Sequence, residues 1–132
     1  MKTRIAHGMN RLARVGLVFV LSTGLLVAST PAEVAQAEYE EIMTLTPNPA
    51  NGHKAYITCV VCHRPEGWGT IDGTYPQIAG QHRTVIIKQL ADIRARNRDN
   101  PLMYPFSVPR VLGGPQNIAD VAAYLAQLAM NP

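Results

Sequence analysis

A five-residue stretch near the middle of the chain, Cys59-Val60-Val61-Cys62-His63, constrains the fold more than any other feature. It contains both cysteines of the 132-residue chain. Residues three and four positions apart share one face of an α-helix. On a helix, the two thiols and the imidazole therefore point to the same side, where they can hold one group together. The rest of the chain then has to fold around whatever this cluster binds.

The spacing C-x-x-C-H is the attachment signature of haem c. The two thiols can reach the two vinyl groups on one edge of the porphyrin, while His63 brings a ring nitrogen to the iron. We therefore predict one covalent haem c, with its iron, held by Cys59 and Cys62 and ligated by His63. Three other interpretations remain. A thioredoxin-like redox pair needs a βαβ context, a disulfide between such close residues stabilises little, and a zinc site needs a fourth ligand such as His53 or His82.

The N-terminal 37 residues have the organisation of a secretory signal peptide. Residues 1–14 contain four basic residues and no acidic one, residues 15–28 are mostly apolar, and Ala35-Gln36-Ala37 is a small-x-small cleavage site. We predict residues 1–37 to be a signal peptide that is removed after Ala37, which directs residues 38–132 to the periplasm of a bacterium. The alternative is an uncleaved membrane anchor, but a spanning helix needs about 20 apolar residues.

The net charge of +3 comes from this N-terminal segment. Residues 38–132 carry equal numbers of basic and acidic residues, so the composition gives no reason to expect a nucleic-acid partner. Three arginines lie close together, at Arg94, Arg96 and Arg98. Such runs are most often solvated faces, and a docking patch for a partner is the other interpretation.

The pattern of apolar residues and prolines predicts an all-α domain with long loops. Asn48-Pro49 is a typical helix start, and two later segments have apolar residues at helical spacing. The expected helices run from Pro49 towards Cys62, over 81–96 and from Pro115 onwards. The expected irregular segments are a polar lead-in at 38–48, a glycine-containing loop at 64–80 and a proline-punctuated segment at 101–115. Loops this long in so small a domain suggest that a large apolar cofactor packs between them.

A methionine is the natural second axial ligand, because a thioether opposite histidine suits reversible one-electron transfer. The segment 38–132 offers Met43, Met103 and Met130. Met43 lies in the lead-in and Met130 close to the C-terminus. Met103 lies between Pro101 and Pro105, which restrict the backbone and can hold a weak ligand in place. We predict Met103 as the distal ligand.

Residues 49–128 resemble a class I cytochrome c, most closely the bacterial cytochrome c4/c5/c553 group. The segments that carry the resemblance are Gly52-His53-Lys54, Cys59–His63, Tyr75–Gln81, Lys88–Ile93 and Ile118–Leu125. The family has a small fold of three or more helices with long loops wrapped around one covalent haem. The resemblance implies thioethers at Cys59 and Cys62, iron ligands His63 and Met103, and a Pro76 carbonyl that binds the second ring nitrogen of His63. It also implies that Gly52 and Tyr56 meet Tyr124 where the terminal helices cross.

The resemblance further implies a periplasmic electron carrier that is not itself an enzyme and that docks transiently on a donor and an acceptor protein. Membrane association is then expected only through these redox partners or an uncleaved signal. Two alternatives remain. The chain could be the haem subunit of a larger periplasmic oxidoreductase complex. It could also hold an open iron and act as a gas-binding or peroxidase-like protein.

Overall fold

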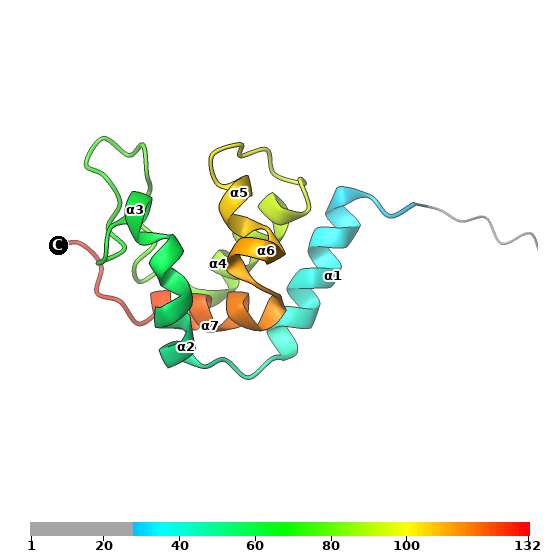
Figure 1. Cartoon of the computed structure of the whole chain (residues 1–132), viewed down its shortest axis with the longest axis horizontal. Helices are drawn as coiled ribbons and strands as arrows, with labels where there is room; N and C mark the ends of the chain where they lie inside the picture. Colours follow the sequence, from blue (N-terminus) through cyan, green and yellow to red (C-terminus); the bar gives the residue numbers. More distant parts are fainter. Residues whose placement is uncertain (1–27) are drawn as a thin grey trace, which may run out of the picture.

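The computed structural model describes residues 28–132, which form helices joined by loops, with no strand in that range (Figure 1). The predicted all-α fold class is confirmed. The elements are α1 (Pro31–Thr44), α2 (Pro49–Ala55), a 3-10 turn (Tyr56–Thr58), α3 (Val60–His63), α4 (Arg83–Arg94), α5 (Tyr104–Ser107), α6 (Pro109–Leu112) and α7 (Pro115–Leu125). Residues 1–27, which include most of the predicted signal peptide, lie outside the described residues. Within 28–132, no helix is both long and apolar enough to cross a membrane.

Helices α2 and α7 cross in close contact, and the crossing depends on a glycine (Figure 1). A Cβ atom at Gly52 would lie 2.1 Å from the backbone oxygen of Asp120 and 2.9 Å from Cβ of Tyr124. The rings of Tyr56 and Tyr124 lie 5.5 Å apart beside it. The expected meeting of Gly52 and Tyr56 with Tyr124 is therefore confirmed. Only a residue without a side chain lets the two backbones approach this closely.

A buried carboxylate ties the start of α2 to α7. Asp120 accepts hydrogen bonds from the backbone N–H of Asn48 (2.7 Å) and from the side chains of Asn51 (2.6 Å) and Gln116 (2.7 Å). Burial alone raises the pKa of Asp120, but the three hydrogen bonds hold it below its usual value. Asn48 is also the N-cap of α2, since its side chain accepts from the N–H groups of Ala50 and Asn51. This confirms the predicted helix start.

Helix α1 shows that the prediction of a polar lead-in at 38–48 was wrong for residues 38–44. The helix starts with a capping box, in which Thr30 and Glu33 bind each other's backbone N–H groups. Pro31 occupies the first turn, where its missing N–H costs nothing. Ala35 and Ile42 are fully buried, and α1 packs against α4 and α7. The predicted cleavage site after Ala37 lies in the middle of this helix.

The proline-punctuated segment also contains helix, contrary to expectation. Two single-turn helices, α5 and α6, lie between residues 104 and 112, and each has a proline in its first turn. The prolines therefore start these turns instead of interrupting them. The helix expected from Pro49 towards Cys62 is instead divided into α2, the 3-10 turn and α3.

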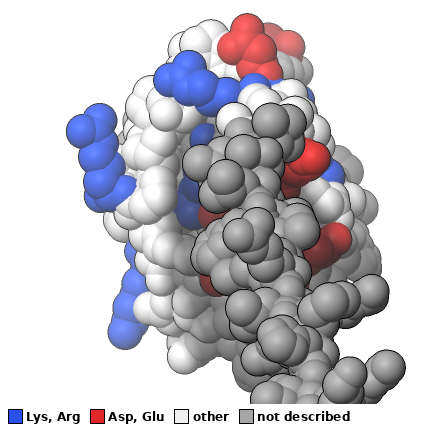
Figure 2. Space-filling model, turned by 90° about the vertical axis from the view of Figure 1, so that its right-hand side faces the viewer, with Lys and Arg blue, Asp and Glu red and all other residues white. Residues whose placement is uncertain are grey.

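Charged side chains of both signs are present on the face at the α1 end of the molecule. Figure 2 shows that the Lys and Arg side chains on the described part of this face are separated from one another by uncharged residues. The run of Arg94, Arg96 and Arg98 does not form one solvated face. The Arg94 side chain is only 9 % exposed, and the Arg96 guanidinium stacks on the Tyr104 ring at 3.8 Å.

Candidate functional site

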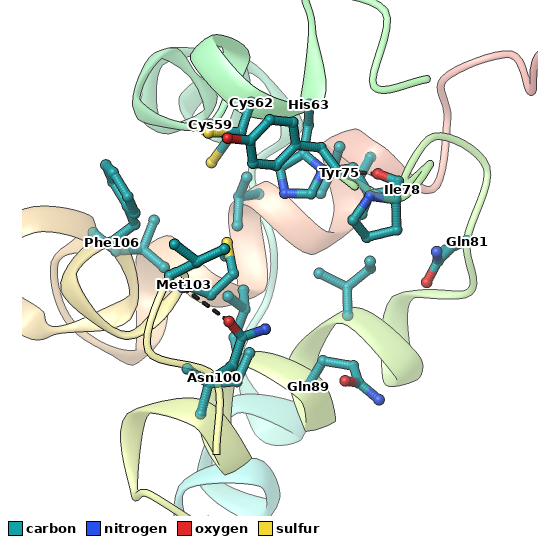
Figure 3. A pocket seen from close by; sticks show the side chains of 18 of the residues that line it. Cys59, Cys62, His63, Tyr75, Ile78, Gln81, Gln89, Asn100, Met103 and Phe106 are labelled. Atoms are coloured by element: carbon teal, nitrogen blue, oxygen red, sulfur yellow. Dashed lines mark hydrogen bonds between the residues drawn. The ribbon is translucent and has the colours of Figure 1, made fainter. Parts of the chain in front are cut away.

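A pocket of about 370 Å³ lies between α3, α4, α5 and α7 (Figure 3). Its volume is within the range of pockets that hold cofactor-sized molecules. All five sequence-predicted site residues line it: Cys59, Cys62, His63, Pro76 and Met103. Most of the remaining lining is apolar and comes from Ile78, Val85, Ile86, Leu90, Ile93, Leu112, Val121 and Leu125. The pocket therefore combines an apolar interior with a few chemically reactive groups.

One wall of the pocket carries the two thiols and the imidazole. Cys59 precedes the single turn of α3, and its carbonyl accepts from the backbone N–H groups of Cys62 (3.2 Å) and His63 (2.9 Å). This tight turn brings the three side chains to the same side, as Figure 3 shows. No disulfide joins the two cysteines. Burial raises the pKa of Cys59 in spite of a hydrogen bond with Thr58 that lowers it.

The imidazole of His63 has one defined orientation. Its Nδ1 lies 2.8 Å from the carbonyl oxygen of Pro76, and because a carbonyl only accepts, Nδ1 carries the proton. The Nε2 lone pair is then free for a metal ion, which is the usual arrangement of a ligating histidine. His63 is buried, at 4 % exposure.

Two glycines that the sequence analysis did not single out hold Pro76 in place. The carbonyl of Gly67 accepts from the N–H groups of Ile78 (2.8 Å) and Ala79 (3.0 Å). Gly69 has a φ of +69°, and a Cβ atom there would lie 2.1 Å from the Tyr75 carbonyl oxygen. The loop therefore turns back onto the pocket at positions where larger residues do not fit. In the sequence, the glycine content of residues 64–80 predicted a loop. It did not predict that the backbone of this loop turns back onto the pocket.

Met103 lines the opposite side of the pocket, where Figure 3 shows it facing the wall that carries His63. Its backbone N–H donates to the side chain of Asn100 (3.1 Å). The two other methionines of 38–132 lie elsewhere: Met43 packs against the core cluster, and Met130 is 62 % exposed beside Gly80. Among these three, Met103 is the thioether that lines this pocket.

These residues fit a haem. The pocket offers two thiols at one edge, an oriented imidazole on one side, a thioether on the other, and apolar walls for a flat apolar ring. Gln81, Gln89 and Arg98 also line it, and their N–H donors suit the carboxylates of such a group. None of these three residues was predicted from the sequence as part of the site.

The competing interpretations of the cysteine motif find no support in the described part of the chain. No cluster of three or more His, Cys, Asp or Glu side chains there could hold a metal ion, so a zinc site has no ligand set. A thioredoxin-like motif needs strands around it, and residues 28–132 contain none.

Comparisons with known proteins agree on one family. Residues 49–129 match the sequence profile described as Cytochrome c. The chain is 38 % identical to cytochrome c4 of Thiocapsa roseopersicina over 79 residues, which cover 60 % of this chain and 38 % of that protein. It is 43 % identical to cytochrome c4 of Pseudomonas aeruginosa over 72 residues, covering 53 % of this chain and 35 % of the relative. The chain thus matches little more than a third of the length of these relatives.

Proposed function

Because this chain belongs to the cytochrome c family, we propose that it is a periplasmic carrier of single electrons whose haem iron is bound by His63 and Met103. The observation that carries the proposal is the pocket in which these two side chains lie on opposite sides of one apolar space. Histidine and methionine together leave an iron without an open position for substrate. The proposed role is therefore electron transfer and not catalysis.

The chain carries one covalently bound haem c, since the family match includes the C-x-x-C-H arrangement. A bound haem supplies an iron that gains and loses one electron. In the proposal, Cys59 and Cys62 hold the group by thioether bonds, and the Pro76 carbonyl keeps the His63 ring in its ligating orientation. The apolar lining excludes water and so favours the thioether of Met103, a weak neutral ligand.

The proposed partners are one donor and one acceptor protein that dock in turn. Electron-transfer encounters use small interfaces, below about 1,200 Å². The names of the relatives support a cytochrome role, and the donor and acceptor are further proposals. No nucleic-acid partner is proposed, and any membrane contact is expected through the redox partners or a retained signal segment.

Substitution of Met103 by alanine tests the proposed ligand set. We expect the haem to stay attached, the weak ferric sulfur-to-iron absorption band to disappear, and the reduced protein to bind carbon monoxide stoichiometrically, because the iron position opposite His63 opens. Optical spectra of the oxidised and reduced protein, with and without carbon monoxide, measure this. The unsubstituted protein is expected not to respond to carbon monoxide within the time that Met103→Ala takes to saturate.

Met130→Ala is the matched control, because it removes a methionine that is exposed and is not among the residues that line the pocket. It should leave the spectra unchanged. If Met103→Ala keeps the sulfur-to-iron band, Met103 is not the ligand. If the unsubstituted protein binds carbon monoxide readily, the iron is open, and the gas-binding or peroxidase-like alternative replaces the electron carrier.

The N-terminus of the exported protein tests the proposed processing. The sequence predicts cleavage after Ala37, which separates 1–37 from 38–132. The burial of Ala35 and the capping box at Thr30 support a different site ahead of Thr30, where Ala28 and Ser29 follow the apolar run. We expect N-terminal sequencing and intact mass of the periplasmic protein to show a chain that retains all of α1. A chain beginning at Glu38 would contradict this expectation.

A further inference from the structure

The end of α4 holds the segment that carries Met103. Arg94, in the last turn of α4, uses all three guanidinium nitrogens. Its Nε donates to the Ser107 carbonyl (2.6 Å) and its Nη2 to the Gly113 carbonyl (2.9 Å). Ser107 is the last residue of α5, and Gly113 directly follows α6. One side chain therefore binds both short helices that follow Met103.

Two neighbouring contacts fix the beginning of the same segment. The guanidinium of Arg96 lies 3.8 Å from the centre of the Tyr104 ring, a cation–π contact to the residue that follows Met103. The Asn100 side chain accepts from the Met103 N–H. Two arginines of the run, together with Asn100, thus contact the segment on both sides of α5. This is a structural use of a run that the sequence analysis left as a solvated face or a docking patch.

The charge of Arg94 is balanced by α1. Its Nη1 donates to Glu38 at 2.6 Å, and the two side chains are only 9 % and 16 % exposed. A buried guanidinium without such a partner is strongly unfavourable. Glu38 lies on α1, outside the residues 49–129 that match the cytochrome c profile. Helix α4 contacts both α1 and α5, so it lies between the acid of the pair and the segment that Arg94 binds.

We propose that Arg94, paired with Glu38 of α1, is a positioning residue that keeps Met103 at the iron opposite His63. The inference rests on the proposed function, because it assumes that Met103 is the axial ligand. Arg94 is not among the residues that line the pocket, and it acts through the backbone carbonyls of Ser107 and Gly113. Ligation of the iron by Met103 then depends on α1, because α1 supplies Glu38, the partner of Arg94.

Arg94→Met tests the proposal, because it removes every donor and keeps much of the apolar stem. In the haem-loaded protein we expect the sulfur-to-iron band to weaken and the rate of carbon monoxide binding to rise at least tenfold, while the far-ultraviolet circular dichroism shows that the helices remain. Arg94→Lys keeps the charge but cannot reach three acceptors in the same geometry, so we expect an intermediate rate. Glu38→Gln should move the rate in the same direction by a smaller factor. Arg110→Met, at an exposed position of α6, is the matched control and should leave it unchanged.

The outcomes separate this inference from the proposed function. If Met103→Ala leaves the band unchanged, the proposed ligand set fails. If Met103→Ala opens the iron but Arg94→Met behaves like Arg110→Met, the positioning role alone is wrong. If Arg94→Met does not fold, Arg94→Lys and Glu38→Gln test the positioning role in its place. Unchanged carbon monoxide binding in both of these variants overturns the proposal.

Discussion

Replacing Gly52 by alanine is expected to lower the free energy of unfolding by about 3 kcal/mol, the upper end of the usual cost of overpacking. The added methyl group would lie 2.1 Å from the Asp120 carbonyl oxygen and 2.5 Å from its carbon. Both are backbone atoms of α7, so no side chain can rotate to relieve the overlap. Helix propensity acts in the opposite direction, since alanine is favoured over glycine by about 1 kcal/mol within a helix. A net decrease in the free energy of unfolding would therefore show that α2 and α7 cross as closely as the structure indicates.

Thermal unfolding of the haem-loaded protein, followed by circular dichroism, measures this change. A loss of this size lowers the midpoint by roughly 12 °C or more in a domain of under about 100 residues. Gly114→Ala is the control, because a Cβ atom there meets nothing within 4 Å and its φ is −79°. As an N-cap change it should cost about 1 kcal/mol or less. Equal midpoints for Gly52→Ala and the unsubstituted protein would mean that the helices do not cross this closely.

Removing both thiols, in the double variant Cys59→Ala and Cys62→Ala, is expected to abolish covalent attachment of haem. These are the only cysteines of the chain, and both line the pocket. Without haem, the apolar side chains that line the pocket of about 370 Å³ lose the group they would pack against, and contact of apolar surface with water is unfavourable. A small domain has only about 5–15 kcal/mol of unfolding free energy to offset such a loss. We therefore expect the haem-free chain to lose stable tertiary structure as well.

Denaturing electrophoresis with haem staining measures attachment, since only covalently bound haem migrates with the polypeptide. Each single variant should retain at most one thioether and show reduced staining. Val61→Ala is the control, because Val61 lies between the cysteines but is 84 % exposed. It should stain like the unsubstituted protein. Full staining of the double variant would show that other residues attach the haem.

Local sequence patterns were sufficient for the features that depend on contacts within a few residues. The Asn48 cap binds N–H groups two and three positions later, so Asn48-Pro49 could be recognised without knowing the rest of the fold. The spacing of Cys59, Cys62 and His63 likewise needs only one helical turn, which α3 supplies. The start of α1 also had a local signal, Thr30-Pro31-Ala32-Glu33, which is a capping-box pattern. It was missed because the same residues follow an apolar run typical of a signal peptide.

The positions of Pro76, Met103 and Arg94 could not be derived from local patterns. Pro76 reaches His63 because Gly67 and Gly69 turn the loop back, and the sequence shows glycine content without the direction of the turn. Met103 was predicted from its flanking prolines, but its place at the pocket accompanies the packing of α5 on α4. Arg94 looked like one charge in a solvated run, and its burial arises from acceptors on three other segments, at Glu38, Ser107 and Gly113. Such contacts join residues far apart in the chain, and their formation depends on the packing of whole helices, which short-range spacing does not encode.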